Sequence, residues 1–182
     1  MAYFQNRQYL SQQMYEQVQS KDVLVKEPLW LIYAETDPGS SITSSQIIGF
    51  TDYAKLNSYQ EDMKLVSKQM SGSKGVYANN LLLSIPSSGV SIEFFNQFSG
   101  QAILNTIILT EVILVNGSSG SSSNTSPSSR QSITYSTCRI ESYKRTVGQE
   151  IELSVFYNQR SATYTQYENG AKSGKIVSSS FS

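Results

Sequence analysis

The chain contains no histidine and only one cysteine, Cys138. Without histidine there is no imidazole for acid–base catalysis, for a Ser-His or Cys-His nucleophile, or for binding a transition metal. A single cysteine excludes a disulfide within the chain and a zinc site built from several thiolates, and it fits a reducing compartment. We therefore expect a protein that is not an enzyme and that binds no cofactor and no metal.

Charge of either sign is also scarce. The 14 Lys and Arg balance the 14 Asp and Glu, and charged residues make up 15% of the chain. Without a basic excess there is no electrostatic footprint for nucleic acid, so we expect no nucleic-acid partner.

Long hydrophobic segments are missing as well. The most apolar stretch, 102–115, is interrupted by polar residues and is shorter than the ~20 residues that span a bilayer. The N-terminus has no basic region followed by an apolar one, which is the pattern of a secretory signal. We expect no membrane span and a protein that is cytoplasmic when made.

The 182 residues are enough for one domain with a substantial core. We assign residues 27–182 to a single domain and residues 1–26 to an N-terminal arm or extension. In the arm, Leu10, Met14 and Val18 are spaced to lie on one side of a short helix. The alternative is a polar terminus without a role.

Several segments have the composition of β-strands. The clearest pattern is the alternation of Ile151, Leu153, Val155 and Tyr157 with polar residues, which is typical of a strand with one wet face. Five other segments also favour strands, at 29–33, 47–57, 76–85, 101–115 and 131–145. The sequence therefore predicts a mainly β protein, most simply a small barrel or sandwich of antiparallel strands.

One helix is expected in the body of the chain, over about residues 88–99. Pro86 ends the strand before it, and Ser87 and Ser88 are good N-cap residues. Within the segment Val90, Phe94 and Phe98 recur every four residues, and Gly100 is placed to end the helix. This aromatic face requires a sheet to pack against.

Two segments between strands carry few apolar residues or none. Residues 58–75 carry charges and small residues, which predicts a hairpin extension or a flexible loop. Residues 117–130 are a Ser/Gly-rich, low-complexity segment. Because such a segment buries too little apolar surface to offset its ordering entropy, we expect a flexible surface loop there.

Pairs of carboxylates are the remaining candidates for catalysis. Glu150 and Glu152 lie on one side of a predicted strand, and the other candidate pairs are Glu35 with Asp37 and Glu61 with Asp62. A solvent-facing strand also accounts for Glu150 and Glu152, and no loop has the spacing of a calcium site. The 12 tyrosines are better explained by core packing and subunit contacts than by ligand stacking.

The order of these elements resembles the Hcp family, the tube proteins of type VI secretion systems, which are related in fold to phage tail-tube proteins. The resemblance rests on the apolar opening strand, the strand over 47–57, the long loop 58–75, the strand over 76–85 and the helix after Pro86-Ser87-Ser88. The strand over 107–115 and the closing strands from Gln149, with the Asn169-Gly170 turn, add to it. It covers roughly residues 28–170.

The resemblance implies a small β-barrel with one flanking helix, and hexameric rings of this subunit that stack head to tail into a hollow tube inside a contractile sheath. The implied partners are other copies of the chain, sheath, baseplate and spike proteins, and effector cargo. The implied route is export through the contractile apparatus, without a signal peptide, to the extracellular space or a target cell.

The matching loop is then the candidate for contact between rings, and its candidate contact residues are Ser58, Glu61, Asp62, Lys64, Lys68 and Lys74. Three alternatives remain open at this point: a virion tail-tube protein, a monomeric β-sandwich module that binds carbohydrate through exposed tyrosines, and a hydrolase that uses Glu150 and Glu152.

Overall fold

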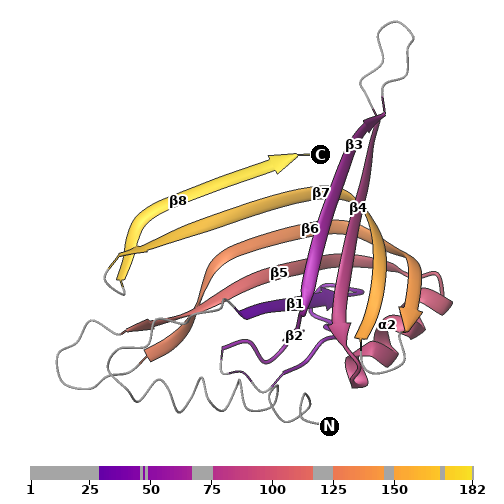
Figure 1. The fold of residues 1–182 in the computed structure, drawn as a ribbon, viewed down its shortest axis with the longest axis horizontal. Coiled ribbons are helices and arrows are strands. Elements are labelled where there is room, and N and C mark those ends of the chain that lie inside the picture. Colours follow the sequence, from indigo (N-terminus) through magenta and orange to yellow (C-terminus); the bar gives the residue numbers. More distant parts are fainter. Residues whose placement is uncertain are drawn as a thin grey trace, which may run out of the picture.

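A computed structural model describes residues 29–45, 47, 49–66, 76–116, 125–145, 150–168 and 171–181. These residues form an eight-stranded antiparallel sheet and one helix, so the predicted mainly β class is confirmed (Figure 1). The arm predicted over residues 1–26 lies outside the described residues, and the division into arm and domain stays a prediction. The elements are β1 (Leu29–Glu35), β2 (Ala54–Lys55), β3 (Ser58–Val66), β4 (Val76–Pro86), α2 (Gly89–Ser99), β5 (Ile103–Asn116), β6 (Thr125–Arg145), β7 (Glu150–Glu168) and β8 (Ala171–Phe181).

The sheet is curled into a half-barrel. Its strand order is β2-β1-β5-β6-β7-β4-β3, with β8 added beside β7. β2 and β3, at opposite ends of this order, are parts of one chain segment. Between them the Leu56 amide donates to the Trp30 carbonyl (3.0 Å) and the Asn57 amide donates to the Ser84 carbonyl (2.8 Å). Residues 54–58 therefore connect the first strand to the last across the open side of this curled sheet, which we call the barrel.

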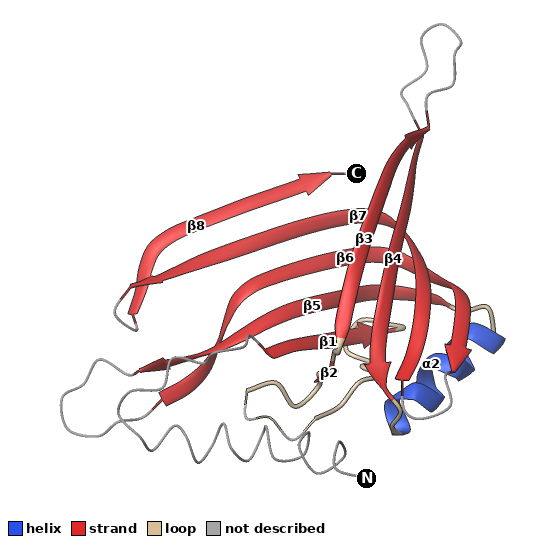
Figure 2. Cartoon of the chain, in the orientation of Figure 1, coloured by secondary structure: helices blue, strands red, loops and turns tan. Residues whose placement is uncertain are grey.

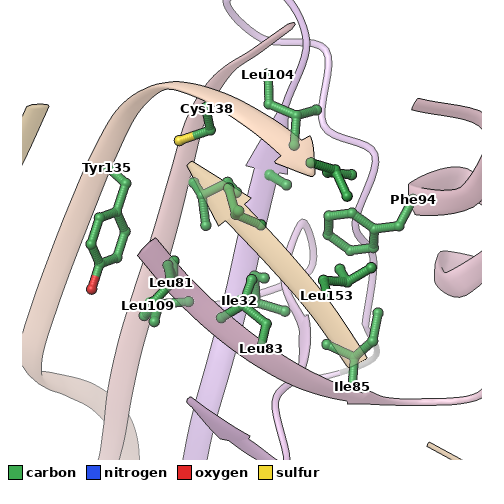
Figure 3. Packing of buried hydrophobic residues seen from close by; sticks show 14 of the residues in the cluster. Ile32, Leu81, Leu83, Ile85, Phe94, Leu104, Leu109, Tyr135, Cys138 and Leu153 are labelled. Atoms are coloured by element: carbon green, nitrogen blue, oxygen red, sulfur yellow. The ribbon is translucent and has the colours of Figure 1, made fainter. Parts of the chain in front are cut away.

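The core fills the inside of this barrel. The alternating residues predicted on β7 all point inward, and Ile151, Leu153, Val155 and Tyr157 are at most 1% exposed. Figure 3 shows side chains from β1, β4, β5, β6 and β7 packed together, with Phe94 of the helix among them. One face of such a strand is buried in the core and the other is exposed, so apolar and polar residues alternate along it. The sequence shows this alternation directly.

The single described helix covers one end of the barrel (Figure 2). Ser88 is its N-cap residue, as predicted, and the Ser91 hydroxyl donates to the Ser88 carbonyl (2.5 Å). Phe94 is fully buried, whereas Phe95, the next residue, is 48% exposed. Gly100 follows the helix in a right-handed conformation, and Gln101, with φ of 52°, takes the left-handed position instead.

Two predicted boundaries differ from the structure. The strand expected over 47–57 is present only at Ala54–Lys55, and most of the segment before it is a looped region. There Gly49 has a φ of +82°, and the Ser45 hydroxyl donates to the Phe50 carbonyl at 2.7 Å. Local bonds of this kind compete with a strand ladder.

The predicted loop 117–130 is also too long, since β6 begins at Thr125 and its first residues pair with the end of β5. The hydrogen bonds of a ladder are made by the backbone, so a segment rich in serine and threonine can also form one. Residues 117–124 lie outside the described residues.

Candidate functional site: the projecting hairpin and its base

The predicted segment 58–75 is a hairpin extension over its described part. β3 and β4 pair in register from Ser58 opposite Ser84 to Val66 opposite Val76. Ser58, Glu61, Asp62 and Lys64 therefore lie on β3, whereas Lys68 and Lys74 lie outside the described residues. Figure 1 shows the two strands projecting away from the rest of the sheet.

The hairpin separates from the sheet at a fork on one edge of β7. β4 occupies this edge from Glu150 to Phe156, and β8 occupies it from Arg160 onward. At the fork the Asn79 side-chain amide donates to the Tyr157 carbonyl (3.2 Å), in place of the strand pairing that ends there. From Val76 to Asn79, β4 pairs only with β3 among the described residues. A two-stranded ribbon is marginally stable alone in water, so the hairpin depends on what holds its base.

Glu61 fastens this base to β7. Its Oε1 accepts hydrogen bonds from the Tyr157 hydroxyl (2.8 Å) and from Arg160 Nε (2.7 Å). The carboxylate and guanidinium side chains are only 16% and 18% exposed. Their charges cancel in a region of reduced dielectric, where charge-assisted hydrogen bonds are strong. Glu61 thus bonds to β7 on both sides of the fork.

Two further contacts reinforce the same region. Glu111 of β5, almost fully buried, accepts from Arg130 Nε of β6 (2.8 Å), and this bond raises the pKa of Arg130. The Trp30 and Tyr59 rings lie 4.9 Å apart, which joins β1 to the start of the hairpin strand β3. Polar and aromatic contacts thus hold together strands β1, β3, β5, β6 and β7 below the hairpin.

The sequence does not identify Tyr157, Arg160, Glu111 or Arg130 as a group. Glu111 does carry a signal, because a carboxylate within the apolar stretch 102–115 has to find a partner when the strand is buried. The identity of that partner depends on strand register. Arg130 belonged to the predicted loop, and Arg160 is separated from Glu61 by 99 positions.

Three more of the carboxylates proposed as catalytic candidates, Glu150, Glu152 and Glu35, have partners within the molecule. Glu150 accepts from the Asn57 side-chain amide (3.1 Å), and Glu152 forms an exposed ion pair with Lys144 (3.0 Å). Glu35 accepts from the Tyr33 hydroxyl (2.6 Å), which lowers the pKa of Glu35 and raises the pKa of Tyr33 to about 12. Each of these carboxylates therefore has a hydrogen-bond or ion-pair partner in the folded chain.

The lone thiol lies in the core. Cys138 is fully buried, and burial raises its pKa to about 12, so the reactive thiolate form is suppressed. Within the described ranges, no group of three or more acidic, histidine or cysteine side chains is placed to hold a metal ion. None of the helical residues described forms a segment long and apolar enough to cross a membrane.

Comparisons with solved structures show which proteins share this fold. The chain superimposes on Hcp1 of the E. coli EAEC 042 pathovar with a TM-score of 0.61 and 9% identity, covering 84% of this chain and 98% of that one. It matches the secreted protein Hcp3 of Pseudomonas aeruginosa with a TM-score of 0.57 and 8% identity, covering 84% and 99%. It matches a type six secretion system protein with a TM-score of 0.55 and 14% identity, covering 84% and 95%.

No protein-family model and no curated protein matches the sequence. The likeness is therefore one of backbone architecture, and it spans almost the whole length of the proteins compared. The resemblance to Hcp proteins is confirmed, and so is the predicted small barrel of antiparallel strands with one flanking helix, which the structure shows as a curled half-barrel sheet: the chain has the fold of Hcp tube proteins.

Proposed function

We propose that this chain is a structural subunit of a hollow tube, in which hexameric rings stack head to tail inside a contractile sheath. The observation that carries the proposal is the shared fold, which covers 84% of this chain and 94% or more of the Hcp structures compared. A structural role also agrees with the missing histidine and with carboxylates that are bound within the molecule.

Strand edges supply a means of joining subunits into a ring. Among the described strands, β3 pairs only with β4, and β8 pairs only with β7. The outer edges of β3 and β8 therefore present backbone donors and acceptors to a neighbouring chain. Contacts between different edges are heterologous, and heterologous contacts close into a ring when the rotation between copies permits.

The hairpin is the proposed contact between rings. It projects beyond the sheet, and a two-stranded ribbon gains stability when it packs on another surface. We propose that Lys64, Lys68 and Lys74 contact the next ring. Because Glu61 is bound to Tyr157 and Arg160, we assign it the different role of fixing the direction of the hairpin. Ser58 and Asp62, near the base of β3, lie in the same supporting region.

The proposed partners follow from this role. They are other copies of the chain, the sheath around the tube, and the baseplate and spike proteins at its end, with effector proteins as cargo. The subunit would be made in the cytoplasm and leave the cell through the apparatus it helps to form. Hcp3 of Pseudomonas aeruginosa is a secreted protein, and the likeness to it supports the proposed route.

Shortening the hairpin tests the assignment. In one variant an Asn-Gly turn replaces residues 64–78 and connects Met63 to Asn79, which face each other in the register. We expect this variant to form rings that no longer stack, as seen by sedimentation velocity and negative-stain microscopy. Stacked tubes of normal length from this variant would overturn the role of the hairpin.

Two charge-reversal variants distinguish a direct contact of the hairpin lysines from a general effect of net charge on stacking. Lys64→Glu, Lys68→Glu and Lys74→Glu change the hairpin, whereas Arg139→Glu, Lys144→Glu and Arg145→Glu make the same change of charge at exposed positions of β6. We expect the first set alone to abolish stacking. A wild-type protein that remains a 20.2 kDa monomer at all concentrations would reject the tube and favour a monomeric binding module.

A further inference from the structure

An apolar patch lies on the side of β1 and β5 that points away from the core. Ile32 of β1 belongs to the core cluster, so its neighbour Leu31 points to the other side of the sheet. In the register with β5, Leu31 lies opposite Thr110 (Figure 1). Leu29 lies opposite Val112 in the same way, and opposed residues share one side of an antiparallel pair. We call these four residues the β1–β5 patch: Leu29, Leu31, Thr110 and Val112.

This patch is covered, although it points away from the core. Leu31 and Val112 are fully buried and Thr110 is 2% exposed, yet none of the three belongs to the core cluster. Farther along the same row of the sheet, Ser132 is half-buried and Thr163 is exposed. The cover therefore lies over β1 and β5 and ends before β7.

Described residues account for one end of this cover. Tyr33 is the next residue on the same side of β1, and its ring lies 5.4 Å from that of Tyr53. The rings of Tyr53 and Phe50 lie 5.3 Å apart. Val112 lies near the other end of β1, opposite Leu29, where the chain enters the sheet. Apolar side chains have to cover this end as well, because a bare apolar patch is a surface for association.

Two segments outside the described residues adjoin the patch in sequence, and they differ in composition. Residues 117–124 follow β5 and consist only of Gly, Ser and Asn. The N-terminal arm precedes β1 and contains Leu10, Met14 and Val18, which we call the arm stripe, spaced to lie on one side of a short helix. Between the stripe and β1, residues 19–28 reach up to about 33 Å when extended. This is long enough for the chain to turn back over the patch.

We infer that the N-terminal arm, residues 1–26, packs across the β1–β5 patch through the arm stripe. A short amphipathic helix is marginal alone in water, and it gains stability when its apolar side is buried against a sheet. The apolar side chains of the patch and the stripe then cover each other. The arm is thereby a part of the folded subunit and not a free tail. This inference goes beyond the proposed function, because it concerns the single subunit and requires no tube.

Thiol protection tests the cover. Val112→Cys places a thiol in the patch, and Thr163→Cys places one at an exposed position on the same side of the sheet. The native Cys138 is buried and its pKa is raised to about 12, so wild-type protein gives the background labelling. Each variant is prepared with and without residues 1–26 and is labelled with a small maleimide as dilute free subunits.

We expect removal of the arm to accelerate labelling of Val112→Cys by about tenfold or more, because the cover of the thiol is lost. Labelling of Thr163→Cys should not change. Equal rates for Val112→Cys with and without the arm would overturn the inference. Protection of the full-length chain that disappears on dilution would show that a second copy covers the patch, and this would overturn the inference as well.

Charges in the arm provide a second test at full chain length, in case truncation prevents folding. One set of changes, made in the Val112→Cys protein, removes the arm stripe: Leu10→Asp, Met14→Asp and Val18→Asp. The matched set adds the same charge on the other side of the predicted helix: Gln8→Asp, Gln12→Asp and Gln19→Asp. We expect only the first set to accelerate labelling of Val112→Cys, with folding of both sets followed by circular dichroism.

Equal protection in the two sets would overturn the assignment to the arm stripe. Unfolding of the first set alone would support the inference, because charges on a free tail do not unfold the barrel. Failure of wild-type protein to form tubes would reject the proposed function and leave these measurements on free subunits unaffected.

Discussion

The barrel and the projecting hairpin are built from the same kind of antiparallel ladder, yet they are stabilised differently. In the barrel, β1, β4, β5, β6, β7 and α2 all contribute buried apolar side chains to one core. The hairpin leaves this core at Asn80 and relies on its own ladder and on Glu61 at its base. One region is therefore stabilised by burial, and the other by a few polar contacts.

This difference separates two tasks of a subunit that assembles. The barrel supplies a rigid body, because close packing tolerates little rearrangement. The hairpin supplies a surface for a second copy, and part of its stability is gained only when that copy binds. Changes in the barrel should therefore affect folding, whereas changes in the hairpin should affect assembly more than folding.

The largest effect is expected from the helix residue in the core. Phe94 is fully buried, and Phe94→Ala removes a ring without filling the space, which should lower the free energy of unfolding by about 3–5 kcal/mol. Urea denaturation followed by circular dichroism measures it. The matched control is Phe95→Ala. The Phe95 ring is 48% exposed, and its centroid lies 5.3 Å from that of Tyr143. Its removal should lower the free energy of unfolding by about 1 kcal/mol or less. Equal losses from the two variants would contradict the burial of Phe94.

Alkaline pH is expected to act next, also through the barrel. Burial raises the pKa of both Tyr135 and Tyr157, whereas in the unfolded chain tyrosine titrates near 10.0. Because the folded state holds these protons more tightly, their contribution is complete below pH 10 and is lost as the pH rises further. Each tyrosine should cost about 1.4 kcal/mol for each pH unit above about 10.

Urea denaturation at about pH 8 and about pH 11 measures this loss. Tyr135→Phe removes one of the two titrating groups. The free energy of unfolding should therefore fall less between the two pH values, by the contribution of one tyrosine. A variant whose stability falls as steeply as that of wild type would show that Tyr135 does not titrate in this way.

The next effect concerns the base of the hairpin. Glu61→Gln leaves Arg160 with an uncompensated charge at 18% exposure, and we expect a loss of about 1–3 kcal/mol. Stacking of rings should weaken further than this stability loss explains, because the hairpin loses its fixed direction. Sedimentation velocity under conditions where both proteins are folded measures it.

A double-mutant cycle sharpens this prediction. If Glu61 and Arg160 act on each other, Glu61→Gln with Arg160→Gln should cost less than the sum of the single changes. Simple additivity of the two losses would mean that the ion pair does not couple β3 to β7.

The smallest effect is expected from an exposed ion pair on the barrel strands β6 and β7. Lys144 and Glu152 are 70% and 54% exposed, so Glu152→Gln should change the free energy of unfolding by about 0–1 kcal/mol. Assembly should be unchanged. A loss as large as that of Glu61→Gln would remove the distinction between the two carboxylates.

Periodicity made much of the barrel predictable. The alternation from Ile151 to Tyr157 and the four-residue spacing of Val90, Phe94 and Phe98 report burial on one face directly, and both predictions are confirmed. The looped region before Ala54 was misjudged because its structure depends on hydroxyl groups and on one left-handed glycine. β8 was not expected, since its serine-rich sequence has little apolar periodicity and its pairing depends on β7.

The hairpin base was not predictable in the same way. Glu61 was singled out for its place in a charged segment, but its partners Tyr157 and Arg160 lie 96 and 99 positions away. Their meeting depends on the pairing of β3 with β4 and of β4 with β7, in one register.

Electron cryomicroscopy of the purified wild-type protein at high concentration tests the central claim most directly. The account predicts hollow rings stacked into tubes, with the β3–β4 hairpin of each subunit in contact with the adjacent ring. Monomers of 20.2 kDa without rings at any concentration would contradict it.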